Sequence, residues 1–219
     1  MLTQIKFGTS GWRAVVAEEF TFANVQRAVS GIARYVASQK PKGARVIVGR
    51  DPRFLGEAFC AMAADILAAQ GIVPLVVADP APTPAFAHAV VANKADGIIN
   101  FTASHNPPEY NGIKFSTPDG CPALPEVTRR IEAQISAGDT SATSEMVIPL
   151  PVETGSLDPK PAYLKRLSEI IDLSAIKKAG LKAVFDPMWG SARGYSDELL
   201  RGAGVQVATV HDYRDVLFG

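Results

Sequence analysis

Short apolar runs alternate with amphipathic segments along most of the chain. Residues 45–49 are apolar and β-branched and end at a Gly-Arg-Asp-Pro loop, and residues 72–77 and 97–101 form similar runs. Between these runs, residues 56–70 and 86–91 carry apolar side chains at helical spacing. Strands that alternate with helices are typical of layered α/β domains. The pattern therefore predicts an α/β fold.

Further elements flank these units on both sides. Residues 22–38 form an amphipathic pattern for which Thr21 is the expected N-cap. A strand is expected over residues 113–116 and a helix over residues 125–135. We assign residues 1–138 to a first domain on this basis.

A change of composition separates this domain from the rest of the chain. Residues 139–158 are rich in Ser, Thr, Gly and Pro and contain one short extended piece at residues 146–152, which is typical of a linker. Residues 159–219 then begin a second α/β unit, with helices expected over 161–171 and 191–202 and strands expected over 182–185 and 205–210. Because so few strands cannot close a layered sheet, we expect this second domain to be cut short.

Composition narrows the functional classes. The chain has 219 residues, of which 47% are hydrophobic, and 22 basic residues balance 22 acidic ones. A chain of this length can bury a large core. The zero formal net charge and the lack of long basic blocks give no electrostatic surface for nucleic acid or an anionic membrane. A small-molecule partner is therefore favoured.

The lack of a targeting signal and the use of cysteine favour a cytoplasmic location. The sequence has no apolar run of about 18 residues, the length of a membrane span, and its first residues lack the apolar region of a signal peptide. Cys60 and Cys121 are far apart and stand in no zinc-binding spacing, so we expect neither a disulfide nor a structural metal. We therefore expect a cytoplasmic protein.

Polar residues of several chemical types gather in residues 102–114, between two expected strands. Ser104, His105, Asn106 and Lys114 lie in this segment. In open α/β sheets, ligands bind at the carboxyl ends of strands, and the segment directly follows such an end. A turn in which Ser104 and Asn106 only cap backbone amides is the alternative. A hydroxyl, an imidazole, carboxamides and a lysine together exceed what a turn requires, which favours a functional site.

Four segments carry a resemblance to a known family. Residues 102–107 (Thr-Ala-Ser-His-Asn-Pro), followed by Asn-Gly-Ile-Lys-Phe at 111–115, resemble the active-site loop of the α-D-phosphohexomutases, the phosphoglucomutase and phosphomannomutase superfamily. Residues 7–13 resemble the amino-terminal signature of that family, and residues 49–53 resemble a loop of its first domain. Residues 184–190 are similar to the opening of its second domain.

The resemblance implies a fold and an activity. The expected architecture is a layered α/β/α first domain with a mixed sheet, followed by an incomplete second α/β domain. The expected reaction interconverts hexose 1-phosphate and hexose 6-phosphate through a phosphoserine and a hexose 1,6-bisphosphate. The motifs lean toward glucose or mannose rather than glucosamine as the sugar. The expected partners are these sugar phosphates, with no nucleic acid and no membrane.

The resemblance also assigns catalytic roles by position. Ser104 would be the phosphorylated nucleophile, because a phosphoserine stores a phosphoryl group reversibly. Arg13 and Lys114 would stabilise the added negative charge, and Lys114 could also move the proton of the sugar hydroxyl. His105 is the rival for that proton, although adjacency in sequence is expected to keep it from facing Ser104, so a contact to substrate or phosphate is the alternative.

Three more residues are assigned to phosphate binding by the same resemblance: Ser10, Arg50 and Asn106. Asn106 could instead hold the loop through backbone hydrogen bonds, which is the interpretation we favour. Arg50 and Arg53 flank Asp51, and an ion-pair network that shapes the cleft competes equally with direct phosphate contact.

A magnesium ion is the cofactor that the resemblance implies for the full-length enzyme. In the family, the metal lies between the phosphoserine and three aspartates of a second-domain loop that this sequence does not contain. Ser104, through its phosphate, would be the remaining ligand. Asp197, Asp212 and Asp215 have a different spacing and are not assigned as ligands. We therefore expect weak or no Mg²⁺ binding and no mutase turnover by the chain alone.

Three alternatives remain open from the residues. A noncatalytic sugar-phosphate binding module with the same fold would share the motifs. A nucleotide-binding protein is disfavoured because neither a Gly-x-Gly-x-x-Gly nor a Walker sequence occurs. A serine hydrolase is weakened because Ser104 lacks a Gly-x-Ser-x-Gly elbow, and only His88 and His211 could act as a distant base.

Overall fold

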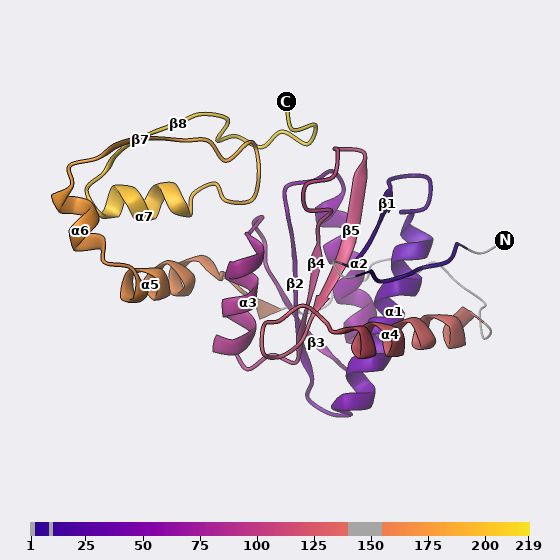
Figure 1. Cartoon of the computed structure of the whole chain (residues 1–219). Coiled ribbons are helices and arrows are strands. Elements are labelled where there is room, and N and C mark those ends of the chain that lie inside the picture. The colour runs from indigo at the N-terminus through magenta and orange to yellow at the C-terminus, as the bar shows by residue number, and fades with distance from the viewer. Residues whose placement is uncertain (1–2, 9–10, 140–154) are drawn as a thin grey trace.

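The computed structural model of the chain describes residues 3–8, 11–139 and 155–219. Ser10 and the extended piece expected at 146–152 lie outside the described residues. The rest forms two units, which Figure 1 shows side by side.

The first unit is built on a six-stranded mixed sheet (Figure 1). Its strands follow the order β1-β5-β4-β2-β3-β6, with bounds Trp12–Val15, Tyr110–Ser116, Gly97–Phe101, Arg45–Arg50, Val73–Val76 and Gly155–Ser156. β4, β2, β3 and β6 run parallel to one another, whereas β5 pairs antiparallel with both β4 and β1. The mixed α/β fold expected from the sequence is thus confirmed.

Helices cover both faces of this sheet. α1 (Phe22–Gln39), α2 (Gly56–Ala69) and α4 (Pro125–Asp139) pack on one face, where Phe59, Phe101 and Ile131 are buried in the larger core. α3 (Thr83–Ala92) covers the other face, in a second core that α5 (Lys160–Ile170) joins. As expected, Thr21 caps α1 and accepts a hydrogen bond from the backbone of Asn24 at 3.3 Å.

Several boundaries differ from the expectations. α4 continues four residues past 135, because its last turns pack on α1, where Arg34 donates to the carbonyl of Gln134 at 2.6 Å. β6 lies inside the expected linker 139–158 and extends the first sheet by pairing with β3. The helix expected from residue 191 begins only at Ser196, after Gly194, whose φ of 72° is left-handed. β1 and the short helix α6 (Leu173–Lys178) were not expected.

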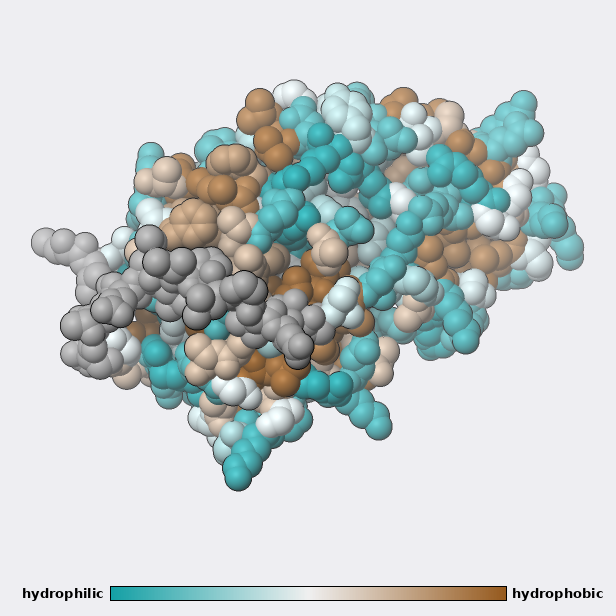
Figure 2. All heavy atoms as spheres, turned by 180° about the vertical axis from the view of Figure 1, so that it is seen from behind, coloured by the Kyte–Doolittle hydropathy of each residue, from teal (hydrophilic) through white to brown (hydrophobic). Residues whose placement is uncertain are grey.

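The second unit consists of α5, α6, α7 (Ser196–Gly202) and a parallel pair of strands, β7 (Lys182–Phe185) and β8 (Gln206–Thr209). Parallel strands normally have both faces buried. Here Val184 is 70% exposed, and no residue of α5 or α6 is fully buried, although Tyr163 and Leu164 of α5 pack partly buried against the second core. Figure 2 shows brown apolar residues at the surface of this unit, on the right of the view. The described residues therefore leave this layer open.

The two cysteines are free and differ in exposure. Cys60 is buried in α2, and burial raises the pKa of its thiol to about 12, whereas Cys121 is exposed. Within the described ranges, no helix has both the length and the apolar character needed to cross a membrane.

Candidate active site

The loop that follows β4 presents Ser104 at the carboxyl ends of the parallel strands. Ser104 is exposed, and its φ of 58° lies in the left-handed region. Its backbone amide donates to Thr102 Oγ1 at 3.0 Å, which fixes the turn directly after the strand. A strained backbone held by its surroundings is typical of functional sites. The loop therefore directs the Ser104 hydroxyl outward from a fixed position.

The Arg53 guanidinium holds this loop by hydrogen bonds to its backbone carbonyls. Its Nη2 donates to the carbonyls of Ser104 and Asn106 at 3.1 and 2.6 Å, and its Nη1 donates to those of Pro107 and Tyr110 at 2.7 and 2.9 Å. Arg53 is only 2% exposed. One buried side chain thus satisfies four backbone oxygens of the loop, so its role is to position the loop.

Asp51 completes this support at the carboxyl end of β2. Its Oδ2 accepts from Arg53 Nε at 3.2 Å and from Thr102 Oγ1 at 2.5 Å, and its Oδ1 accepts from the Arg53 amide at 3.0 Å. Burial raises the pKa of Asp51, although the hydrogen bonds from Thr102 and Arg53 lower it. Thr102, which the sequence did not single out, thus joins Asp51 to the amide of Ser104. A threonine two residues before the serine, at the end of a strand, was the available signal.

Arg50 takes part in an ion pair, but its partner is not Asp51. Its side chain is 7% exposed, and Nη2 lies 3.0 Å from Glu57 Oε1 and donates to the carbonyl of Ala78 at 2.9 Å. The network expected around residues 50–53 therefore splits into an Arg50–Glu57 pair and an Arg53–Asp51 pair. Direct contact of Arg50 with phosphate stays a prediction.

Arg13 lies on β1 and Lys114 on β5, and Asn106 lies in the Ser104 loop itself. Arg13 Nη1 donates to Asn106 Oδ1 at 2.8 Å. Lys114 lies on β5, opposite Asn100 of β4. Burial lowers the pKa of Lys114, Arg13 lowers it further, and Asp51 partly offsets both effects. A lysine with a lowered pKa is suited to transfer protons near neutral pH.

His105 lies closer to Ser104 than the sequence led us to expect. Its Nδ1 is 3.4 Å from Ser104 Oγ, although the residues are adjacent. The left-handed backbone of Ser104 accounts for the difference, because it departs from the extended geometry in which neighbouring side chains point to opposite sides. The separation is at the long limit of a hydrogen bond.

Ser104, His105 and Lys114 line a cavity of about 360 Å³ between the two units, whereas Arg13, Arg50 and Asn106 are not among its lining residues. The first unit contributes Asp51, Pro52, Thr83, Thr102, Ser104, His105 and Lys114, and the second contributes Gly190, Ser191 and Phe218. The sequence analysis missed Ser191, because it was placed in a helix, and Phe218, because an isolated aromatic residue carries no motif. The Ser104 hydroxyl, the His105 imidazole and the Lys114 amine, which were expected to act together, thus line the same cavity.

The described residues do not fit a complete magnesium site. Among them, no group of three or more His, Cys, Asp or Glu side chains could hold a metal ion. Asp197 pairs with Arg201 at 2.7 Å, Asp212 accepts from Thr209 at 2.6 Å, and Asp215 accepts from the amide of Leu217 at 2.9 Å. Mg²⁺ requires a near-octahedral shell of oxygens, of which Ser104 could supply only those of its phosphate.

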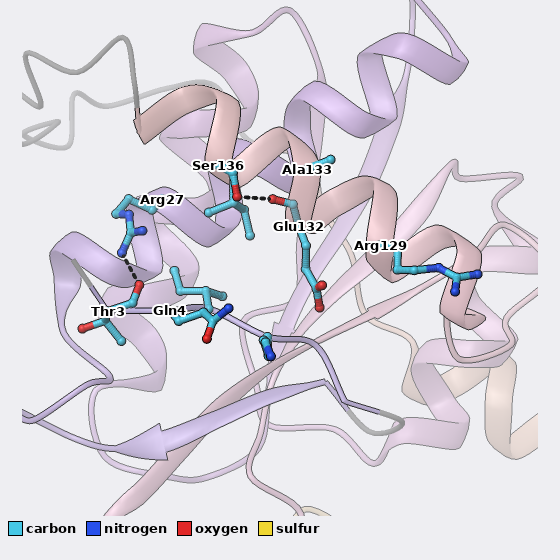
Figure 3. A pocket seen from close by; sticks show the side chains of 10 residues that line it. Thr3, Gln4, Arg27, Arg129, Glu132, Ala133 and Ser136 are labelled. Atoms are coloured by element: carbon cyan, nitrogen blue, oxygen red, sulfur yellow. Dashed lines mark hydrogen bonds between the residues drawn. The ribbon is translucent and has the colours of Figure 1, made fainter. Parts of the chain in front are cut away.

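A second cavity, of about 450 Å³, lies between the amino-terminal segment, α1 and α4 (Figure 3). Arg27 Nη1 donates to the carbonyl of Thr3 at 3.0 Å, and Ser136 Oγ donates to that of Glu132 at 3.1 Å. None of the residues expected to carry chemistry lines this cavity. The site of interest is therefore the cavity at Ser104.

The fold and the loop together define a class of protein. A mixed α/β/α layer with a serine presented at the end of β4 is the arrangement expected of a phosphohexomutase first domain. The profile of the phosphoglucomutase/phosphomannomutase family, alpha/beta/alpha domain I, matches residues 4–142. The chain belongs to this family.

Relatives with known names support the assignment. The chain is 34% identical over 212 residues to a phosphoglucosamine mutase of Mycolicibacterium paratuberculosis, covering 94% of this chain and 45% of the relative. It is 33% identical over 215 residues to a phosphoglucosamine mutase of Corynebacterium aurimucosum, covering 94% and 46%. The chain thus spans less than half the length of these relatives.

A solved structure shows the same fold. A crystal structure from Thermus thermophilus, provisionally named a phosphomannomutase, superposes with a TM-score of 0.88 at 34% identity, covering 100% of this chain and 48% of that protein. A phosphoglucomutase/phosphomannomutase family protein of Burkholderia thailandensis gives a TM-score of 0.78 at 25% identity, covering 100% and 46%.

Proposed function

We propose that this chain supplies the phosphoserine domain of a phosphohexomutase, an enzyme that interconverts hexose 1-phosphate and hexose 6-phosphate. The observation that carries the proposal is the exposed Ser104, whose backbone carbonyl accepts from buried Arg53 and which lines one cavity together with His105 and Lys114. Neither His88 nor His211, the distant bases that a hydrolase would need, lines this cavity.

The proposed half-reaction transfers one phosphoryl group. Ser104 Oγ forms a bond to a phosphorus of hexose 1,6-bisphosphate while the bond from that phosphorus to the sugar oxygen breaks. The serine loses its proton to a base, and the sugar oxygen gains one proton. Lys114 and His105 are the two groups placed to move these protons. In the reverse direction, the phosphoserine gives its group to a hexose monophosphate.

Positive charge around the loop favours this transfer. Lys114 lines the cavity and Arg13 binds Asn106 of the Ser104 loop, so both cations are placed to stabilise the charge of a phosphoserine. The described hydrogen bond of the Asn106 side chain is to Arg13 and not to the loop backbone, so both roles considered for Asn106, holding the loop and binding phosphate, stay predictions. Because the described residues do not complete a magnesium site, no part of this half-reaction is assigned to a metal ion.

Substrate choice is the finer part of the proposal. The motifs lean toward glucose or mannose phosphates, whereas the curated relatives described above carry the name phosphoglucosamine mutase. We propose a hexose 1,6-bisphosphate as the phosphoryl donor and rank glucose and mannose first. Comparing the glucose, mannose and glucosamine bisphosphates as donors tests this ranking directly.

Intact-protein mass spectrometry tests the proposed function. The purified chain is incubated with each bisphosphate and MgCl₂, and we expect one slow addition of a single phosphoryl mass. Ser104→Ala is expected to take up none, whereas Ser168→Ala, which removes an exposed hydroxyl on α5, is expected to behave as wild type. Phosphorylation of the Ser104→Ala protein would place the nucleophile elsewhere and contradict the proposal.

The same samples separate the catalytic proposal from a binding module. A noncatalytic module would bind hexose 6-phosphate in a calorimetric titration but gain no mass. A coupled assay is expected to detect no steady-state turnover of glucose 1-phosphate by this chain, because the described residues lack a complete metal site. Robust turnover would contradict that expectation.

A further inference from the structure

Segment 211–219, which follows β8, returns to the first unit and binds the loop that carries Arg53. Arg214 makes most of this contact. Its Nε donates to the carbonyl of Pro52 at 3.0 Å, and its Nη2 donates to that of Arg53 at 3.3 Å. Nη1 and Nη2 also lie 2.8 and 3.1 Å from the two carboxylate oxygens of Glu57. One side chain of the second unit is thus bound by a backbone loop and a carboxylate of the first.

Glu57 links this contact to the interior of the first unit. Its Oε1 lies 3.0 Å from Arg50, a buried arginine, and 2.8 Å from Arg214. Partial burial raises the pKa of Glu57, but a backbone hydrogen bond, Arg50 and Arg214 together outweigh burial and hold the pKa below its usual value. The carboxylate is therefore shared by two arginines, one from each unit. We call Arg50, Glu57 and Arg214 the arginine clasp.

The clasp fixes a side chain that reaches the cavity. Phe218, four residues after Arg214, lies over Arg53, with its ring centroid 5.0 Å from the guanidinium carbon. Asp215 holds the turn between them by accepting from the amides of Leu217 at 2.9 Å and Gly219 at 3.4 Å. Phe218 lines the cavity at Ser104. The same Arg53 thus contacts the Phe218 ring and donates a hydrogen bond to the Ser104 loop.

We propose that Arg214 is a positioning residue for phosphoryl transfer at Ser104: through the clasp it fixes Phe218 against Arg53 as the second-unit wall of the cavity. The proposal rests on the proposed function for its chemical consequence. Its structural part, the fixing of Phe218, stands on the contacts alone. The competing explanation is that Arg214 forms an ordinary exposed ion pair, which would contribute little.

Two measurements on Arg214→Gln test the proposal, with Arg166→Gln as the matched control. Arg166 is exposed on α5 and pairs only with Glu169, at 3.2 Å, among the interactions described for it. Hydrogen exchange followed by mass spectrometry reads the clasp itself. We expect faster exchange in residues 52–57 and 211–219 of Arg214→Gln, and wild-type exchange in the control.

The second measurement is the donor concentration that gives half the maximal rate of Ser104 phosphorylation. We expect Arg214→Gln to raise it by about tenfold, the scale of losing hydrogen bonds to a charged group. Phe218→Leu should raise it too, while leaving exchange in residues 52–57 unchanged because its clasp is intact. Arg214→Lys should give partial recovery, since it keeps the charge but cannot bind two carbonyls and a carboxylate together.

Each outcome decides the proposal. Unchanged exchange in Arg214→Gln overturns the proposal whatever the kinetics. If the wild-type chain is phosphorylated and Arg214→Gln needs the same donor concentration as wild type, the proposal is overturned as well. If the wild-type chain accepts no phosphoryl group from any bisphosphate but exchange rises in Arg214→Gln, the clasp is supported and the proposed function fails. Exchange and concentration dependence that shift together support both.

Discussion

Replacing Arg53 with Met should cost the protein about 3–5 kcal/mol of stability, the usual penalty for removing one partner of a buried ion pair. The substitution keeps a long apolar side chain but removes the guanidinium. Asp51, whose side chain is 13% exposed, then keeps a largely buried carboxylate without the Arg53 cation, which lies 3.2 Å away in the native protein. Four loop carbonyls, those of Ser104, Asn106, Pro107 and Tyr110, lose their donor as well.

The magnitude follows from where the group lies. The Arg53 side chain is 3% exposed, so water cannot replace its hydrogen bonds without opening the loop. Since domains are typically stable by about 5–15 kcal/mol, such a loss is a large fraction of the total. Arg53→Lys should fall between wild type and Arg53→Met, because an ammonium keeps the pair with Asp51 but cannot reach all four carbonyls.

Urea unfolding followed by tryptophan fluorescence measures the change, because buried Trp12 reports on the first unit. We expect a lower midpoint with an unchanged slope. Arg166→Met is the matched control, because its side chain is 55% exposed. If Arg53→Met loses no more stability than this control, the idea that one buried guanidinium holds the Ser104 loop is wrong.

Three further predictions concern the Ser104 loop and strand β5, which follows it. Thr102→Val, which removes the hydroxyl between Asp51 and the amide of Ser104, should cost about 1–3 kcal/mol in urea unfolding, the penalty of unsatisfied buried groups, whereas Thr102→Ser should retain most of the stability. Gly112→Ala should cost about 1–3 kcal/mol in the same assay, because an added Cβ would lie 2.7 Å from two backbone oxygens; a neutral result would mean that the strands have room to separate. If protonated Lys114 donates the proton to the sugar oxygen, the rate of Ser104 phosphorylation should fall as pH rises through the lowered pKa of Lys114, at a lower pH than for an ordinary lysine. Lys114→Arg should remove that decline, because an arginine stays protonated. An identical decline in the arginine variant would assign the proton to another group.

The fold of the first unit could be predicted because local signals and packing agree there. The strand over residues 45–49, the helix over 22–38 and the cap at Thr21 all occur near their expected positions. The elements that were missed depend on distant contacts. β1 is four residues long and exists through its pairing with β5, and β6 is a two-residue addition to the edge of β3. Neither has a periodic pattern of its own.

The candidate site divides in the same way. Ser104, His105 and Lys114 were found because they lie in one dense motif, and Arg13 because it belongs to a second. The sequence predicted an ion pair of Arg53 with Asp51 as one of two possibilities, but not the four carbonyls that Arg53 binds or the role of Glu57. A buried arginine that binds backbone oxygens looks in the sequence like any other charged residue. Phe218 reaches the cavity only through the fold of the second unit.

The left-handed backbone of Ser104 has a consequence for engineering this protein. Glycine adopts that conformation without a steric penalty, whereas other residues held in sparsely populated backbone regions cost about 1–3 kcal/mol each. Any selection that rewards thermal tolerance alone would therefore drift toward glycine at position 104 and discard the hydroxyl. Mutant libraries made to stabilise this protein should keep serine at position 104, because a change that raises stability there would remove the hydroxyl needed for activity.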